Sequence, residues 1–189
     1  KWDKQHRRTI VISTNFSGRH FESDGEEFLN RIQHVLSKYS VCPEYIEIEV
    51  TEGVLVKNVA VLEKCMNRLH EMGFRVAIDD FGTGFSSFGS LVDLPIYKLK
   101  IDRSFIHKAP HSTKGLKVME AMVKTGHLLG MKVVIEGAET AQDFKILKDL
   151  ACDYSQGYYT GRPMDEATAT DFLEKNVALR AMFFRGQLD

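Results

Sequence analysis

Short, apolar, β-branched runs alternate with longer segments of helical periodicity along this chain. The alternation predicts a parallel β-sheet whose strands are joined by helical crossovers, because parallel neighbours need a long connection. The expected strands are 9–14, which reads as a buried strand, 46–50, 74–78, 97–101, 132–135 and 154–155. The expected helices are 26–39, 62–69 with a left-handed cap at Gly73, 114–129 stopped by Gly130, 144–150, and further helices from 165 onward.

Two architectures satisfy this order of elements, namely a doubly wound open sheet and a closed (β/α) barrel. A doubly wound nucleotide-binding sheet carries a glycine-rich turn after its first strand, whereas segment 15–19 reads Asn-Phe-Ser-Gly-Arg. The polar residues favour the barrel, in which functional side chains lie at the C-terminal ends of several strands. The ends of the expected strands carry Asn15, Glu49, Glu52, Asp79, Asp80, Lys100, Asp102, Glu136 and Gln156.

So many carboxylates gathered at one level would be very unfavourable without a compensating charge, and bound cations supply one. The set offers oxygen ligands without histidine or cysteine, which favours Mg²⁺ or Mn²⁺ over Zn²⁺. The adjacent Asp79 and Asp80 suit two ions about 4 Å apart, an arrangement that activates water and holds a phosphoryl oxygen. Lys100 can orient that water or neutralise charge developing on phosphate. The pattern predicts hydrolysis of a phosphate ester.

The loop that follows the two aspartates, residues 81–88, has two glycines and several hydroxyl side chains between phenylalanines. Glycines allow backbone to approach a ligand or to move, and aromatic rings can stack on a base. A tight turn anchored by phenylalanines in the core is the alternative, and composition alone leaves both open.

Composition limits the remaining possibilities. The chain has 189 residues, which predicts one domain, and a formal net charge of −1, which argues against binding of DNA or RNA polymers. The three cysteines are scattered without metal-ligand spacing, so reduced thiols and a cytoplasmic location are expected. No apolar run approaches the roughly 20 residues of a membrane span.

Several blocks of the sequence resemble the EAL domain family of bacterial cyclic di-GMP phosphodiesterases. The central block is Ile-Asp-Asp-Phe-Gly-Thr-Gly-Phe-Ser-Ser at 78–87, followed by Leu-Lys-Ile-Asp-Arg-Ser-Phe at 99–105. Further matching blocks, in the family's order, are Asn-Phe-Ser at 15–17, Glu-Ile-Glu-Val-Thr-Glu at 47–52, Glu-Gly-Ala-Glu-Thr at 136–140, Gln-Gly-Tyr at 156–158 and Arg-Pro at 162–163. The resemblance implies a modified TIM-type barrel that hydrolyses cyclic di-GMP to pGpG with two divalent ions, Mg²⁺ or Mn²⁺.

The resemblance also implies a role for each matching residue. Asn15, Glu49 and Asp79 correspond to ligands of the first metal, and Asp80 corresponds to a ligand of the second. Lys100 corresponds to the lysine that contacts the catalytic water. Glu136 corresponds to an acidic position around the metals and the substrate, and the catalytic residues implied are Lys100, Glu136 and Asp80.

The remaining assignments concern the substrate and the loop. Asp102 and Gln156 correspond to positions around the metals and the substrate, and Arg19 is assigned to a phosphate or guanine. Glu52 corresponds to the glutamate that anchors the loop after the two aspartates. The resemblance further implies a homodimer and fusion to sensory or GGDEF-type domains, in a parent protein that can be membrane-anchored.

One element of the family pattern is missing, because the tripeptide Glu-Ala-Leu occurs nowhere in the 189 residues. With six expected strands against about eight in a closed barrel, residues 1–189 are expected to form a single EAL-type barrel domain truncated at its N-terminus. The chain starts at Lys1 without an initiator methionine, which is expected of a cut inside a longer chain. The alternative function is a receptor or regulatory scaffold that binds cyclic di-GMP with weak or no turnover.

Overall fold

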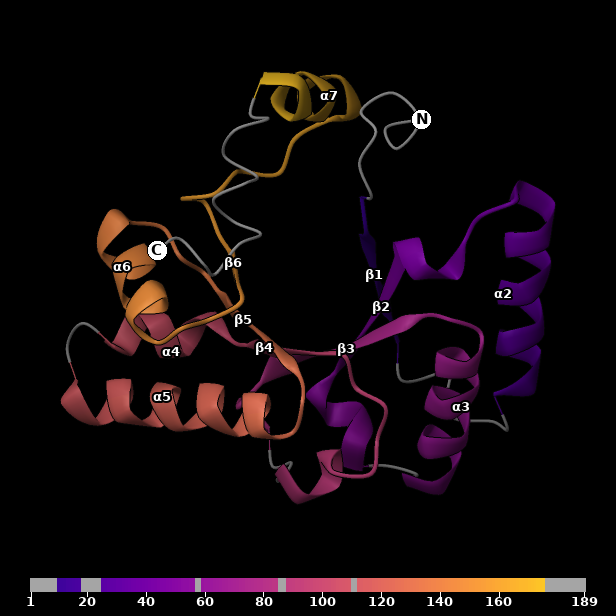
Figure 1. Cartoon of the computed structure of the whole chain (residues 1–189), viewed down its shortest axis with the longest axis horizontal. Helices are drawn as coiled ribbons and strands as arrows, with labels where there is room; N and C mark the ends of the chain where they lie inside the picture. Colours follow the sequence, from indigo (N-terminus) through magenta and orange to yellow (C-terminus); the bar gives the residue numbers. More distant parts are fainter. Residues whose placement is uncertain (1–9, 18–24, 57–58, 85–87, 110–111, 176–189) are drawn as a thin grey trace.

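The computed structural model describes residues 10–17, 25–56, 59–84, 88–109 and 112–175. Its sheet has six parallel strands in the order β1-β2-β3-β4-β5-β6 (Figure 1). A doubly wound sheet reverses its strand order at a switch point, whereas consecutive order is that of a (β/α) barrel. The expected barrel-type fold is confirmed, as a half-barrel with these strands: β1 Ile12–Phe16, β2 Ile46–Thr51, β3 Arg75–Phe81, β4 Lys98–Ile101, β5 Lys132–Glu136 and β6 Tyr154–Gln156.

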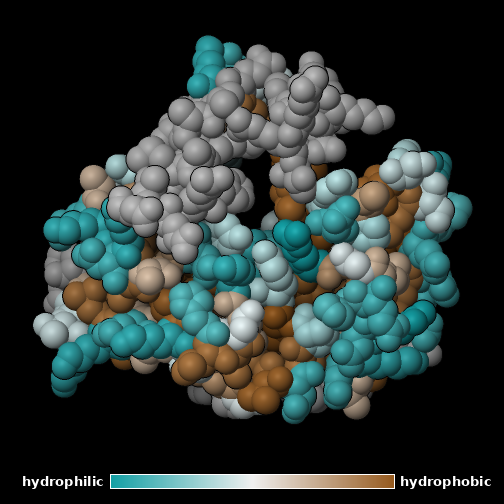
Figure 2. All heavy atoms as spheres, in the orientation of Figure 1, coloured by the Kyte–Doolittle hydropathy of each residue, from teal (hydrophilic) through white to brown (hydrophobic). Residues whose placement is uncertain are grey.

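Helices accompany the strands; all but the last described one lie outside the curved sheet, and that last helix, Glu166–Lys175, lies at the top of the view on the open side (Figure 1). They are α2 Glu26–Tyr39, α3 Val59–Glu71, α4 Arg103–Lys108, α5 Thr113–Leu128, α6 Ala141–Asp149 and α7 Glu166–Lys175, with short 3₁₀ turns η2 Pro43–Tyr45, η3 Glu52–Val56 and η4 Phe88–Leu91. The buried residues of α3 and α5 recur at helical spacing, so each helix turns one apolar stripe toward the sheet. Figure 2 shows hydrophilic side chains over the outer faces of the helices at the right of the view, with hydrophobic side chains between them.

Glycines end two of these helices where the sequence predicts. Gly73 has a φ of 92° after α3, and the Phe74 N–H donates to the Leu69 carbonyl over 3.0 Å. Gly130 has a φ of 77° after α5, in a conformation that disfavours residues with a Cβ atom. Within α5, a Cβ atom at Gly126 would lie 2.7 Å from Val133 Cγ2. This glycine therefore lets α5 pack closely on β5.

The strands turn apolar side chains toward the helices and polar side chains toward the inside of the half-barrel, because successive residues of a strand face opposite ways. The outward residues include Ile48, Val50, Ile78, Leu99, Ile101, Val133 and Ile135, which are all buried in the hydrophobic core. The inward residues include Glu47, Glu49, Asp79, Lys98, Lys100 and Glu136, which form the ion pairs described below. The fold thus brings charged side chains into contact with one another on the inner face of the half-barrel.

One local expectation is wrong, and one helix is missed. Segment 9–14 reads as a buried strand, but β1 runs from Ile12 to Phe16 and Ile12 is 57% exposed, while Thr9 lies outside the described residues. Among the described strands β1 pairs only with β2, so it is an edge strand of the described sheet. Helix α4 is not predicted, because a six-residue helix shows too little periodicity. Of the helices expected from 165 onward, α7 is described and the rest of that segment is not.

Among the residues that the structure describes, none of the helices combines the length and hydrophobicity that a membrane span requires.

Candidate metal centre

The ammonium group of Lys100 lies at the centre of the inner face, held by carboxylates from three strands. Its Nζ is 3.1 Å from Glu49 Oε1 on β2, 2.8 Å from Asp79 Oδ1 on β3 and 2.8 Å from Glu136 Oε1 on β5. The Lys100 side chain is only 4% exposed. Buried charges are stable only when they are paired, and here one cation serves several anions.

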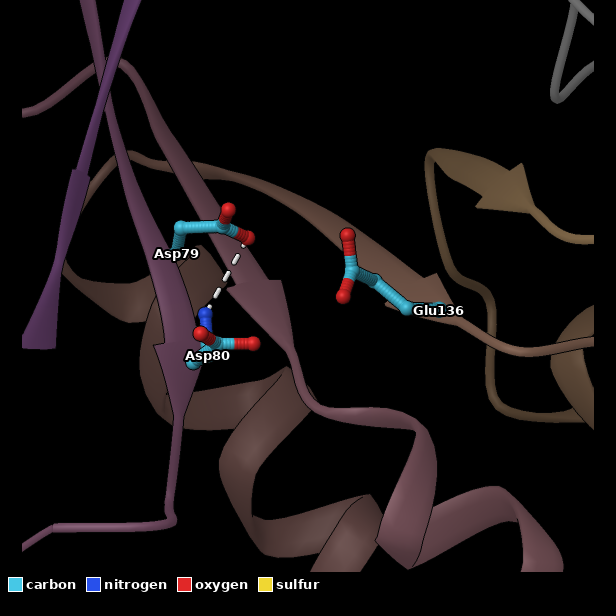
Figure 3. A group of neighbouring side chains, drawn as sticks. All are labelled: Asp79, Asp80 and Glu136. Carbon is cyan, nitrogen blue, oxygen red and sulfur yellow. Dashed lines mark hydrogen bonds between the residues drawn. The ribbon is translucent and has the colours of Figure 1, made fainter. Parts of the chain in front are cut away.

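A β-bulge brings the two adjacent aspartates to the same side of the sheet. Between β3 and β4, Ile78 pairs with Leu99 and Phe81 pairs with Ile101, so β3 contains one extra residue. Asp80 accommodates the bulge with a φ of 55°. This value lies in the left-handed region that residues other than glycine seldom adopt. In a regular strand neighbouring side chains face opposite ways, whereas both carboxylates here face Glu136 (Figure 3). The Asp80 N–H donates to Asp79 Oδ1 over 3.1 Å, which links the pair.

Asp79, Asp80 and Glu136 form a group that fits a metal ion. One carboxylate oxygen from each lies within 4.8 Å of the others, and Figure 3 shows the three carboxylates around a common space. All three donors are hard oxygen atoms of the kind that Mg²⁺ and Mn²⁺ prefer. Glu49, Asp79 and Glu136 contact the Lys100 ammonium group and Asp80 lies beside them, so these four carboxylates outnumber that ammonium group. A divalent cation at these oxygens would offset that excess.

Burial and the neighbouring charges shift the pKa values of three groups at the centre. Burial lowers the pKa of Lys100, but its hydrogen bonds to Asp79 and Glu136 and the nearby negative charges outweigh burial, so the pKa is raised and the group is a cation. Burial raises the pKa of Glu136, and the charges of Asp79 and Asp80 raise it further against the opposing effect of Lys100. Burial and the charge of Asp79 also raise the pKa of Asp80. The carboxyl groups of Asp80 and Glu136 therefore resist ionisation.

The other residues assigned to metal or substrate lie at the borders of this centre. Asn15 on β1 pairs in register with Glu49, and Gln156 on β6 pairs in register with Glu136. Both are therefore at the level of the acids, and both are exposed. Arg19 lies outside the described residues. The sheet thus brings the assigned strand residues to one end, as the sequence predicts for the C-terminal ends of its strands.

Asp102 and Glu52 make local contacts with the backbone. The Asp102 carboxylate caps α4 by accepting from the Ser104 N–H over 2.9 Å, and such bonds lower its pKa although burial acts in the opposite direction. Glu52 Oε2 accepts from the N–H groups of Gly82 and Gly84, both over 2.9 Å. These bonds fix the start of the loop after the aspartates. At the two ends of this loop, the rings of Phe81 and Phe88 pack with their centres 5.0 Å apart. This contact fits the alternative of a turn anchored by phenylalanines in the core.

Sequence reasoning missed a second buried ion pair, between Glu47 and Lys98. The Lys98 Nζ lies 2.7 Å from the Glu47 carboxylate, to which Ser13 Oγ also donates over 2.9 Å. Spacing in the sequence could have indicated this pair. Glu47 stands two positions before Glu49, and Lys98 two positions before Lys100, so each shares a strand face with a residue of the centre.

Comparison with known proteins is consistent with this geometry. A family model described as EAL domain matches residues 1–163. The signaling protein YkoW of Bacillus subtilis is 36% identical over 164 residues, 87% of this chain and 20% of that protein. The cyclic di-GMP phosphodiesterase NbdA of Pseudomonas aeruginosa is 37% identical over 145 residues, 77% of this chain and 18% of that protein.

A solved structure described as "PaMucR Phosphodiesterase, c-di-GMP complex" superposes with a TM-score of 0.83 at 33% identity, covering 89% of this chain and 67% of that one. The chain spans about a fifth of the length of the two curated relatives named above. From the family model, the consecutive parallel strands and the acidic strand ends together, the chain belongs to the EAL domain family.

Proposed function

We propose that this domain hydrolyses cyclic di-GMP to pGpG at the acidic centre, with two divalent cations. The observation that carries the proposal is the cage of carboxylates from β2, β3 and β5 around the Lys100 ammonium group. The relatives support the substrate, because NbdA is a cyclic di-GMP phosphodiesterase and the PaMucR structure is a complex with that nucleotide. Fusion to signalling domains in a dimeric parent protein is part of the same proposal.

In this proposal Asn15, Glu49, Asp79 and Asp80 hold the cations, and Glu136 lies beside Asp79 and Asp80 in the same group of oxygens. Divalent cations there would lower the pKa of water and stabilise negative charge on a phosphoryl oxygen. The donor set suits Mg²⁺ or Mn²⁺.

The chain's own groups would then act on the water and the phosphodiester. Lys100, kept as a cation by its carboxylate neighbours, orients the attacking water and stabilises the charge that develops on phosphate. Glu136, whose carboxylate lies 2.8 Å from the Lys100 ammonium group, is assigned to the catalytic step together with Lys100 and Asp80. Glu52 holds the Gly82 and Gly84 backbone, and so keeps the loop beside the two aspartates in place. Gln156 and Asp102 border the substrate, and Arg19 is assigned to its phosphate or guanine.

The test is an assay of the full-length protein that contains this domain, with Mg²⁺ or Mn²⁺, following pGpG by chromatography. Lys100→Met should lower kcat by about 10² or more, because a charge that acts in the transition state is lost. Glu49→Ala should cause a loss of similar size. The matched control is Lys124→Met, at an exposed position on α5 that forms an ion pair with Glu120 one helical turn away. Tight binding of cyclic di-GMP without pGpG would instead support a receptor or regulatory scaffold.

A further inference from the structure

A second charged layer lies below the acidic centre, inside the half-barrel. It consists of Glu47 on β2 and Lys98 on β4, with Ser13 of β1 donating to the same carboxylate. Glu47 is 1% exposed, and the Lys98 Nζ also lies 5.1 Å from the centre of the Tyr154 ring on β6. Barrel interiors are usually filled by branched apolar side chains, so a buried ion pair at this level is a departure from ordinary packing.

The two layers are parallel copies of one arrangement. Glu47 and Glu49 share a face of β2, and Lys98 and Lys100 share a face of β4, each two residues or about 6.6 Å apart. Both pairs cross over β3, where the small side chain of Ala77 is registered with Glu49 on one side and with Lys98 on the other. Each ammonium group therefore has a second carboxylate one layer away.

In this geometry the carboxylates of the two layers compete for the lysine ammonium groups. A buried carboxylate without a partner is so unfavourable that it attracts the nearest cation. A lysine ammonium on its flexible four-carbon chain can move by one layer to reach it. If Lys98 were absent, Glu47 would draw Lys100 downward, away from Asp79 and Glu136.

We propose that Lys98 is a positioning residue, which neutralises Glu47 and so leaves Lys100 in the upper layer among Asp79 and Glu136. The catalytic consequence rests on the proposed function. The claim about the position of Lys100 is independent of the proposed function. This position also sets how much negative charge the upper carboxylates offer to a metal cation, which can be measured without turnover. A pair that served packing alone would not affect turnover and metal affinity in opposite directions.

The test compares three variants of the full-length protein by kcat, KM and Mn²⁺ affinity, with Mn²⁺ binding measured by electron paramagnetic resonance. Lys98→Met should lower kcat about tenfold with little change in KM, and should tighten Mn²⁺ binding, because Lys100 leaves the upper carboxylates. Glu47→Gln should weaken Mn²⁺ binding by about tenfold, because the unpaired Lys98 moves toward the upper layer. The double variant, Lys98→Met with Glu47→Gln, has no unpaired charge in the lower layer. Most of the turnover lost in Lys98→Met should therefore return, and the Mn²⁺ affinity should return to that of the wild type.

The signs of these changes decide the proposal. Weaker Mn²⁺ binding in Lys98→Met, or a double variant no better than Lys98→Met, overturns it. If Lys98→Met does not fold, Glu47→Gln and the double variant still decide, since unchanged Mn²⁺ affinity in Glu47→Gln is incompatible with the competition. If the wild-type protein makes no pGpG, the proposed function fails, while the Mn²⁺ affinities still test the role of Lys98.

Discussion

Asp80 shows how much of this site depends on a single residue. Its left-handed backbone takes up the extra residue of β3, and its carboxylate completes the group with Asp79 and Glu136. Asparagine tolerates the left-handed region far better than alanine, because its side chain can bond locally. Substitutions at this position can therefore separate the backbone contribution from the charge.

We predict that Asp80→Asn and Asp80→Ala both weaken Mn²⁺ binding by about tenfold or more, because each removes a carboxylate oxygen. Without metal, Asp80→Ala should be less stable than Asp80→Asn by about 1 kcal/mol, because alanine must adopt a φ near 55°. Chemical denaturation without metal and Mn²⁺ titration measure the two effects. Equal stabilities of the two variants would show that the bulge does not depend on this conformation.

At the scale of elements, the loops that follow β5 and β6 pack against each other at the mouth of the half-barrel. The Gly137 N–H donates to the Gln156 carbonyl over 2.7 Å, which ties the end of β5 to the end of β6. A Cβ atom at Gly157 would overlap the backbone carbonyl of Ala138. At Gly161, by contrast, the nearest atom to such a Cβ would be Met164 Cε at 3.7 Å.

Gly157→Ala should therefore lower the free energy of unfolding by about 2 kcal/mol, because the rigid backbone of Ala138 must shift. Gly161→Ala is the matched control, and should stay within about 0.5 kcal/mol of the wild type. Urea denaturation measures both. Equal effects of the two substitutions would contradict the contact between the ends of β5 and β6.

At the opposite end of these strands, Asp153 joins α5, β5 and β6. Its carboxylate accepts from Lys132 Nζ over 2.7 Å, contacts His127 Nε2 at 2.8 Å and accepts from the Val133 N–H over 2.9 Å. Burial raises the pKa of Asp153, but these hydrogen bonds outweigh burial and hold the pKa below its usual value of 3.8. A carboxyl group whose pKa is lowered by folding stabilises the fold in its ionised form.

Asp153→Asn should thus lower the free energy of unfolding by about 2 kcal/mol at neutral pH. The contribution is fully present above pH 3.8 and is lost as pH falls below 3.8 toward the lower pKa of the folded state. Melting temperatures of the wild type and the variant, measured from neutral pH downward, should converge below that value. A constant difference across the range would refute the ionised role.

The sequence predicted the elements that have strong local signals and missed those that arise from packing. Gly73 and Gly130 mark helix ends by their conformational freedom, and strand ends bearing acids indicated the barrel. The bulge was not predictable, because a period of two in the sequence shows no extra residue between Ile78 and Phe81. The Glu47–Lys98 pair depends on register across β3, which only the folded sheet defines.

At the scale of the whole molecule, charge is distributed unevenly. The chain has a formal net charge of −1, yet three carboxylates contact the Lys100 ammonium group at the C-terminal ends of the strands, with that of Asp80 beside them. The folded state alone assembles these oxygens, so a cation that binds them stabilises folded over unfolded chain.

Mn²⁺ at 100 times its dissociation constant should add about 2.7 kcal/mol to the free energy of unfolding, and a chelator should remove this gain. Asp79→Asn should lose most of the gain, because it alters a ligand of the centre. Asp153→Asn should keep it, since that residue lies at the other end of the strands. Denaturation with and without Mn²⁺ measures the increments, and an equal gain in both variants would place the cation elsewhere.

The β-bulge in β3 also has a consequence for protein engineering. A regular strand can offer a ligand to one face only at every second position, so a second neighbouring acid would point into the hydrophobic core. One inserted residue with a left-handed backbone removes that restriction and places two consecutive acids on one face. A parallel barrel without such a site could therefore gain a second adjacent ligand by insertion of a residue, where substitution alone would only bury a charge.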